Sequence, residues 1–106
     1  MVFVTIPQKD AHSFAESLVQ HCLAACVNIL PGVQSIYTWE DQICTDAESL
    51  LLIKTSTVAL PKLRHFVLTE HPYETPEFVV VEVKNEESSQ AYLNWVLSNT
   101  EINSPS

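Results

Sequence analysis

Glycine and basic residues are the scarcest features of this 106-residue sequence. A single glycine excludes the glycine-rich loops that hold nucleotide phosphates in dinucleotide-binding and P-loop proteins. Five lysines and arginines stand against 13 acidic residues, which gives a net charge of −8. A chain without a basic footprint is not expected to bind nucleic acid or an anionic membrane surface.

Cysteines and long apolar runs are also scarce. The three cysteines, Cys22, Cys26 and Cys44, form no CxxC pair, so neither a disulfide framework nor a closed zinc site is expected. Reduced thiols and the absence of a visible secretory signal indicate a cytoplasmic protein. No apolar run approaches the roughly 20 residues of a membrane-spanning helix. With 46% apolar residues, we expect one folded domain over residues 1–100 and a polar tail over 101–106.

The apolar pattern alternates between the periods of strands and helices. Runs with strand character and stripes with helical spacing occur in the order β-α-β-β-α-β-α. The strands are expected at 2–6, 27–39, 49–55 and 77–84, and the helices at 11–22, 60–67 and 92–96. The first six elements follow the split βαβ pattern, which predicts an α+β, ferredoxin-like sandwich with an antiparallel sheet and two helices on one face.

The second face of that sheet carries the main expectation about assembly. Strands that face water on one side alternate between apolar and polar residues. Here Leu50–Ile53 and Val79–Val81 are apolar on both faces. We therefore expect another copy of the chain to cover this face, and the alternative is that the third helix folds over it.

Four segments resemble the CutA family (CutA1, divalent-cation tolerance proteins) in order and spacing. They are LAACVNILPGVQSIYTWE at 23–40, ESLLLIKT at 48–55, HPYETPE at 71–77 and YLNW at 92–95. The resemblance implies a ferredoxin-like protomer in a compact homotrimer, similar in architecture to PII signalling proteins. It also implies a role in tolerance of divalent metals, copper above all, without an established catalytic activity.

The sequence departs from the family pattern at the hairpin turn and at a copper site proposed in the family. Asp41 stands where a glycine often follows Trp-Glu. Val4 and Glu70 stand where that copper site has a cysteine and a histidine, and only the acid Glu77 is retained. The family's copper site therefore does not carry over directly.

Residues 70–77 form the densest candidate site, because an imidazole, a phenol and three carboxylates fall within eight residues. Two prolines stiffen this segment. Imidazole and carboxylate ligands suit divalent metals, and copper has the highest intrinsic affinity among them. The predicted metal ligands are His71, Glu74 and Glu77. The alternative is that Tyr73 and the prolines pack at a subunit contact while the acids remain solvated.

Large or charged side chains near the ends of elements predict a ligand cleft. The candidate cleft residues are Trp39, Lys54, Tyr73, Glu77 and Trp95. Lys54 ends an apolar strand and needs an acidic partner, for which Glu77 or Glu74 is expected. Cys22 and Cys26 are expected to be small buried residues rather than metal ligands, and Cys44 is a candidate exposed thiol.

The leading hypothesis is a non-enzymatic homotrimer that binds a metal ion or small ligand at clefts between its subunits. No nucleophile elbow or catalytic triad is recognisable, so no catalytic residues are predicted. One alternative is a PII-like signalling or scaffold module whose long hairpin docks on a partner protein. Another is a small enzyme whose active site lies between subunits.

Overall fold

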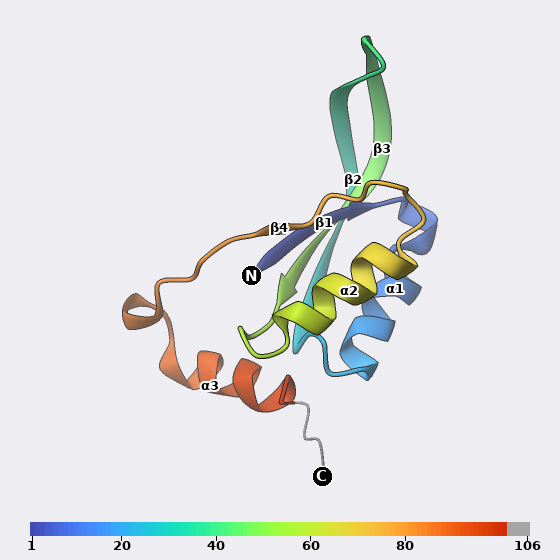
Figure 1. Cartoon of the computed structure of the whole chain (residues 1–106). Helices are drawn as coiled ribbons and strands as arrows, with labels where there is room; N and C mark the ends of the chain where they lie inside the picture. The colour runs from blue at the N-terminus through green and yellow to red at the C-terminus, as the bar shows by residue number, and fades with distance from the viewer. Residues whose placement is uncertain (102–106) are drawn as a thin grey trace.

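The computed structural model describes residues 1–101 and confirms the expected ferredoxin-like order of elements (Figure 1). The sheet is antiparallel, in the order β2-β3-β1-β4. The predicted polar tail lies outside the described residues from position 102 onward. The elements are β1 (Val2–Ile6), α1 (Gln8–Gln20), β2 (Cys26–Trp39), β3 (Gln42–Lys54), α2 (Leu60–Glu70), β4 (Val79–Val80), the 3-10 turn η1 (Asn85–Glu87) and α3 (Gln90–Asn99).

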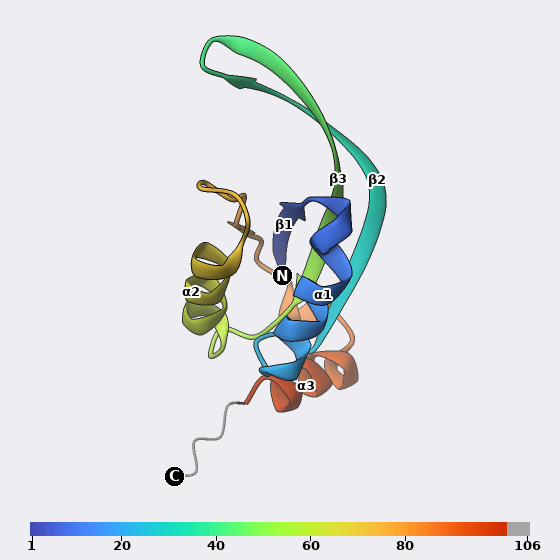
Figure 2. The same cartoon turned by 90° about the vertical axis from the view of Figure 1, so that its right-hand side faces the viewer.

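The hydrophobic core lies between one face of the sheet and the two helices α1 and α2 (Figure 2). Alternate residues of β1 and β3 point into it, as the period of two requires. Its strand and helix residues include Val2, Val4, Ile6, Leu51, Ile53, Phe14, Leu18, Leu63 and Val67. The stripes of the first two predicted helices therefore pack where they were expected, whereas Tyr92 and Trp95 of the third are exposed.

The end of α1 is a Schellman motif with an unusual residue at its left-handed position. The Leu23 N–H donates to Leu18 O at 2.9 Å, and the Cys22 N–H donates to Val19 O at 3.1 Å. Cys22 takes a φ of +58° and is exposed. The expectation that Cys22 is buried is therefore wrong, because the helix ends before it and turns its side chain to solvent. Glycine is the usual residue at this position.

Strands β2 and β3 form a hairpin that extends well beyond the rest of the sheet (Figures 1 and 2). Their pairing runs to a two-residue loop, Glu40-Asp41, in which both residues have positive φ, 51° and 63°. This is the type I′ geometry that matches the twist of the strands. The expected start of the third strand at Ser49 is wrong, since pairing with β2 extends β3 back to Gln42. The single glycine, Gly32, lies in a bulge of β2 between Leu30 and Val33 and has a φ of +73°.

The last strand is much shorter than the predicted 77–84. Only Val79–Val80 pair with β1 as strand, and one further pair follows. There the Val81 N–H donates to Met1 O at 2.7 Å, and the Met1 amino group donates to Val81 O at 3.1 Å. Residues 82–84 extend past Met1 and have no strand beside them within residues 1–101, so the ladder stops.

The sheet face opposite α1 and α2 is left largely open. By alternation it carries Phe3, Leu30, Leu50, Leu52 and Val79, all of them half-buried or exposed. We name these five residues the open face. Helix α3 lies apart from α1 and α2, beyond the end of the sheet (Figure 1). Its Tyr92 lies near Cys26 at the end of β2, and burial followed by this thiol raises the pKa of Tyr92. The alternative in which the third helix covers this face is therefore not what the structure shows.

Candidate functional site

The segment after α2 is fastened to the end of β1 by His71. This side chain is only 7% exposed, and both of its ring nitrogens are engaged. Nε2 lies 2.8 Å from Thr5 O, and Nδ1 accepts from the Tyr73 N–H at 3.0 Å. Because a carbonyl only accepts and a backbone N–H only donates, the ring fits here as the neutral tautomer with its proton on Nε2. Phe14 and Tyr73 pack on the ring at centroid distances of 5.8 and 4.8 Å.

Two tyrosine–carboxylate bonds are made by acids of β3, one at the base of the hairpin and one part-way along it. The Tyr73 hydroxyl donates to Glu48 Oε2 at 2.7 Å, and Glu48 is only 5% exposed. Burial, together with this bond, raises the pKa of Tyr73. The Tyr37 hydroxyl donates to Asp46, and this bond raises the pKa of Tyr37 to about 12. Both phenols therefore keep their protons, and both protons are committed to carboxylates.

Sequence reasoning missed Asp46 and Glu48. Both lie on one face of β3, two positions apart, directly before the apolar run that begins at Leu50. The available signal was the position of Glu48 two residues before Leu50, which puts the acid on the same face as the apolar residues Leu50 and Leu52. Tyr73 was a predicted cleft residue, but Tyr37 and the two acids that accept from these hydroxyl groups were not predicted.

The three predicted metal ligands are not assembled in a single chain. Glu74 and Glu77 are exposed, and Glu77 accepts only a 3.5 Å hydrogen bond from the Thr5 hydroxyl. His71 has no free ring nitrogen. Among residues 1–101 no group of three His, Cys, Asp or Glu side chains is placed to hold a metal ion. The donor set of one chain therefore does not fit a divalent metal, and His71 acts as a structural residue there.

The five predicted cleft residues are also spread over the molecule. Trp39 lies at the tip of the hairpin, whereas Lys54 lies at the opposite end of β3. Trp95 lies on α3 and stacks on Tyr92 at 5.6 Å. Lys54 donates to Asn28 Oδ1. The expected pairing of Lys54 with Glu74 or Glu77 is therefore wrong within one chain, because β3 carries the lysine away from the 71–77 segment.

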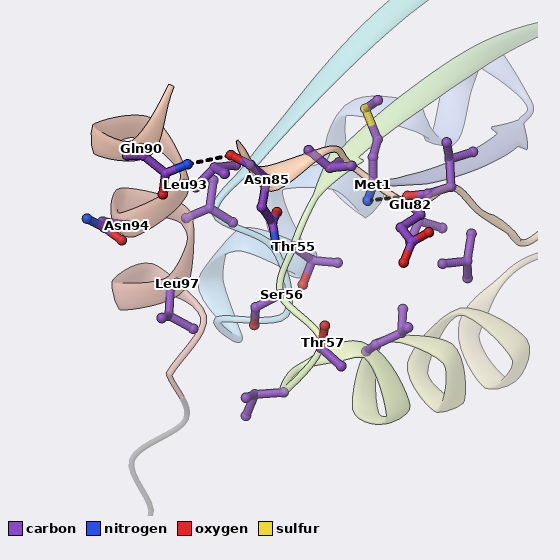
Figure 3. A pocket seen from close by; sticks show the side chains of 17 residues that line it. Met1, Thr55, Ser56, Thr57, Glu82, Asn85, Gln90, Leu93, Asn94 and Leu97 are labelled. Atoms are coloured by element: carbon purple, nitrogen blue, oxygen red, sulfur yellow. Dashed lines mark hydrogen bonds between the residues drawn. The ribbon is translucent and has the colours of Figure 1, made fainter. Parts of the chain in front are cut away.

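A pocket of about 650 Å³ lies between α3, the turn before α2 and the segment after β4 (Figure 3). Hydroxyl and amide groups, including Ser56, Asn85 and Gln90, line it together with valines and leucines. None of the five predicted cleft residues lines this pocket. It is therefore distinct from the predicted cleft.

Comparison with known proteins shows which family the chain belongs to. The model of the CutA1 divalent ion tolerance protein family matches residues 1–99. The chain belongs to this family. The sequence is 45% identical to the divalent-cation tolerance protein CutA of Thermus thermophilus, over 94% of this chain and 96% of that protein. It is 42% identical to the chloroplastic protein CutA 1 of Oryza sativa, of which it spans 56%.

Solved structures agree with this assignment. The PII-like protein CutA from Nostoc in its apo form superposes with a TM-score of 0.92 at 37% identity, covering 96% of this chain and 97% of that one. The Thermus thermophilus protein gives 0.88 at 45% identity, over 93% and 95% of the two chains. The fold and the family predicted from the sequence are confirmed. Within residues 1–101, no helix is both long and apolar enough to cross a bilayer.

Proposed function

We propose that this chain is a non-enzymatic homotrimer of divalent-cation tolerance, with clefts between its copies that take a metal ion or a small ligand. The open face carries the proposal. Val79 on this face is 48% exposed, and the other four residues are half-buried or exposed. Covering about 400 Å² of apolar surface per copy at about 25 cal/mol/Å² supplies about 10 kcal/mol before the costs of association.

The hairpin supports assembly independently. Beyond the body of the sheet no further strand of residues 1–101 lies beside it, and its apolar residues Ile36 and Ile43 are 70% and 81% exposed. A two-stranded hairpin alone is marginally stable in water. Contact with a second copy gives these side chains a surface to pack against.

The scattered cleft residues support a ligand site between copies. One chain keeps Trp39, Glu77 and Lys54 apart, so a ligand site that combines them would draw them from more than one copy. The proposal that this chain binds a divalent cation rests on the family and on the names of its relatives, since the described part of one chain offers no fitting set of ligands. An ion held here would therefore need ligands from more than one copy.

Light scattering and sedimentation test the assembly. The expected particle has three times the 11.9 kDa mass of one chain and keeps this mass on dilution. Leu52→Glu, which places a charge on the open face, is expected to give monomers. Leu68→Glu is the matched control, because Leu68 is exposed on α2. A wild-type particle of one chain's mass at all concentrations contradicts the proposal.

Calorimetric titration with copper(II) chloride tests the metal part. We expect saturable binding by the wild-type trimer and its loss in the Leu52→Glu variant, because the ligands come from different copies. Saturable binding that persists in monomers would place the ion within one chain and contradict a shared site. If the trimer shows no saturable binding, the metal part of the proposal is wrong and only the small-ligand part remains.

The exposed hairpin also favours a second function, docking on a different protein as a PII-like module. Substitution of Ile36 and Ile43 by Ser separates the two roles. Loss of trimer in this variant assigns the hairpin to assembly. An intact trimer that no longer co-purifies with one discrete partner assigns it to docking. The cytoplasmic location stays a prediction.

A further inference from the structure

Lys54 is a cation on an apolar surface, and no acid of residues 1–101 forms an ion pair with it. It is half-buried at the end of β3, and Asn28, across the ladder on β2, accepts its hydrogen bond. The one ion pair among residues 1–101 joins Lys84 to Glu87 and does not involve Lys54. A second copy that covers the open face removes Lys54 from water, and an ammonium group buried without an anion is costly.

Glu77 is an acid on the same face that is free to pair with the Lys54 ammonium group. It lies beside Thr5, at the other end of the face from Lys54. The neighbouring acids Asp46 and Glu48 already accept from tyrosine hydroxyls, whereas Glu77 is exposed and has only one long hydrogen bond. Glu77 is therefore available to a partner, whereas Asp46 and Glu48 are not.

The two charges cannot meet within one chain. Thr5 pairs with Leu50, which lies four residues before Lys54 on β3, and Glu77 lies one strand further across the sheet. Strand rise and spacing separate the Cα atoms of Lys54 and Glu77 by about 17 Å. The attraction is largely screened at this distance, because the Debye length is about 8 Å at physiological salt.

We propose that Lys54 of one copy forms an ion pair with Glu77 of the next copy, so that each interface of the trimer is completed by a charge from its neighbour. This inference rests on the proposed trimer. Opposite charges at opposite ends of one face favour a head-to-tail contact, in which one end of the face meets the other end of the next copy. Such contacts repeat around a closed ring. Apolar faces by themselves can slide against each other, and the ion pair then fixes their register.

A charge swap tests the pair. The variants are Lys54→Met, Glu77→Met and the double variant with Lys54→Glu and Glu77→Lys. Sedimentation at a series of dilutions, in the same sub-denaturing urea for all variants, measures the dissociation constant. Each single variant is expected to weaken assembly by at least about 30-fold, because it leaves one charge buried and unpaired. The swapped double variant is expected to recover to within about 10-fold of the wild type.

Lys9→Met and Glu16→Met are the matched controls, since both residues are exposed on α1, and neither is expected to change assembly. Circular dichroism monitors folding. A single variant that unfolds while the swapped variant is folded and trimeric also supports the pair. A swap that is no better than the single variants overturns it. Weakening by Lys54→Met but not by Glu77→Met also overturns it and assigns the lysine to an anionic ligand. A monomeric wild type overturns the trimer as well.

Discussion

His71→Ala is expected to lower the free energy of unfolding by about 4 kcal/mol. The substitution removes the hydrogen bonds to Thr5 O and from the Tyr73 N–H, each of which contributes about 1 kcal/mol. It also removes a buried ring that packs on Phe14 and Tyr73. Such a truncation lowers the free energy of unfolding by about 2 kcal/mol more. The histidine was predicted from the sequence as a metal ligand, so this measurement separates the two roles.

Guanidinium unfolding of metal-free protein in EDTA, at one fixed protein concentration, is the assay. The midpoint is expected to fall by about 1 M, given a slope of about 4 kcal/mol/M in guanidinium. His65→Ala, which removes an exposed histidine of α2, is the control and is expected to stay within about 0.5 kcal/mol of the wild type. A loss below about 1 kcal/mol for His71→Ala, or a loss seen only with copper present, would refute the structural role.

Three further predictions use the same unfolding assay. Cys22→Gly is expected to stabilise by about 1 kcal/mol because glycine tolerates the left-handed backbone; equal stabilisation by Cys22→Ala, which keeps the Cβ atom, would contradict this. Asp41→Gly is expected to gain a similar amount, about 1 kcal/mol, in the type I′ turn, and a loss would speak against that turn. Stability is expected to fall above the unfolded tyrosine pKa of 10.0, since the folded pKa values of Tyr37 and Tyr73 are raised and only the unfolded chain loses these protons. Glu48→Gln should flatten this decline between about pH 9 and 11.5, and an unchanged slope would argue against the Tyr73 bond.

Local pattern predicted the elements whose partners lie within the chain. The helical stripe containing Phe14 and Leu18 packs where its spacing placed it, and the run at Leu50–Ile53 lies in a central strand. The wrong strand boundaries are those where pairing with a neighbouring strand decides how long the strand is. β3 begins early because β2 continues beside it, and β4 ends early because β1 does not.

The candidate site was predicted less well than the fold, because spacing along the chain does not give side-chain direction. His71 reads as a ligand in the sequence, yet its two nitrogens face the end of β1 and the backbone of its own turn. Lys54 and Glu77 read as partners, yet the sheet holds them at opposite ends of one face. The 70–77 segment was therefore identified as a candidate site, but the contacts of His71 and Glu77 were not predicted.

The sequence by itself determined the family, the order of elements and the presence of a sheet too apolar to face water, since these follow from motif and period. Only the tertiary structure decided which charges lack partners, which histidine is structural and which face stays open. Those features depend on which strands run beside each other and how far, and this is set by pairing between residues distant in the chain.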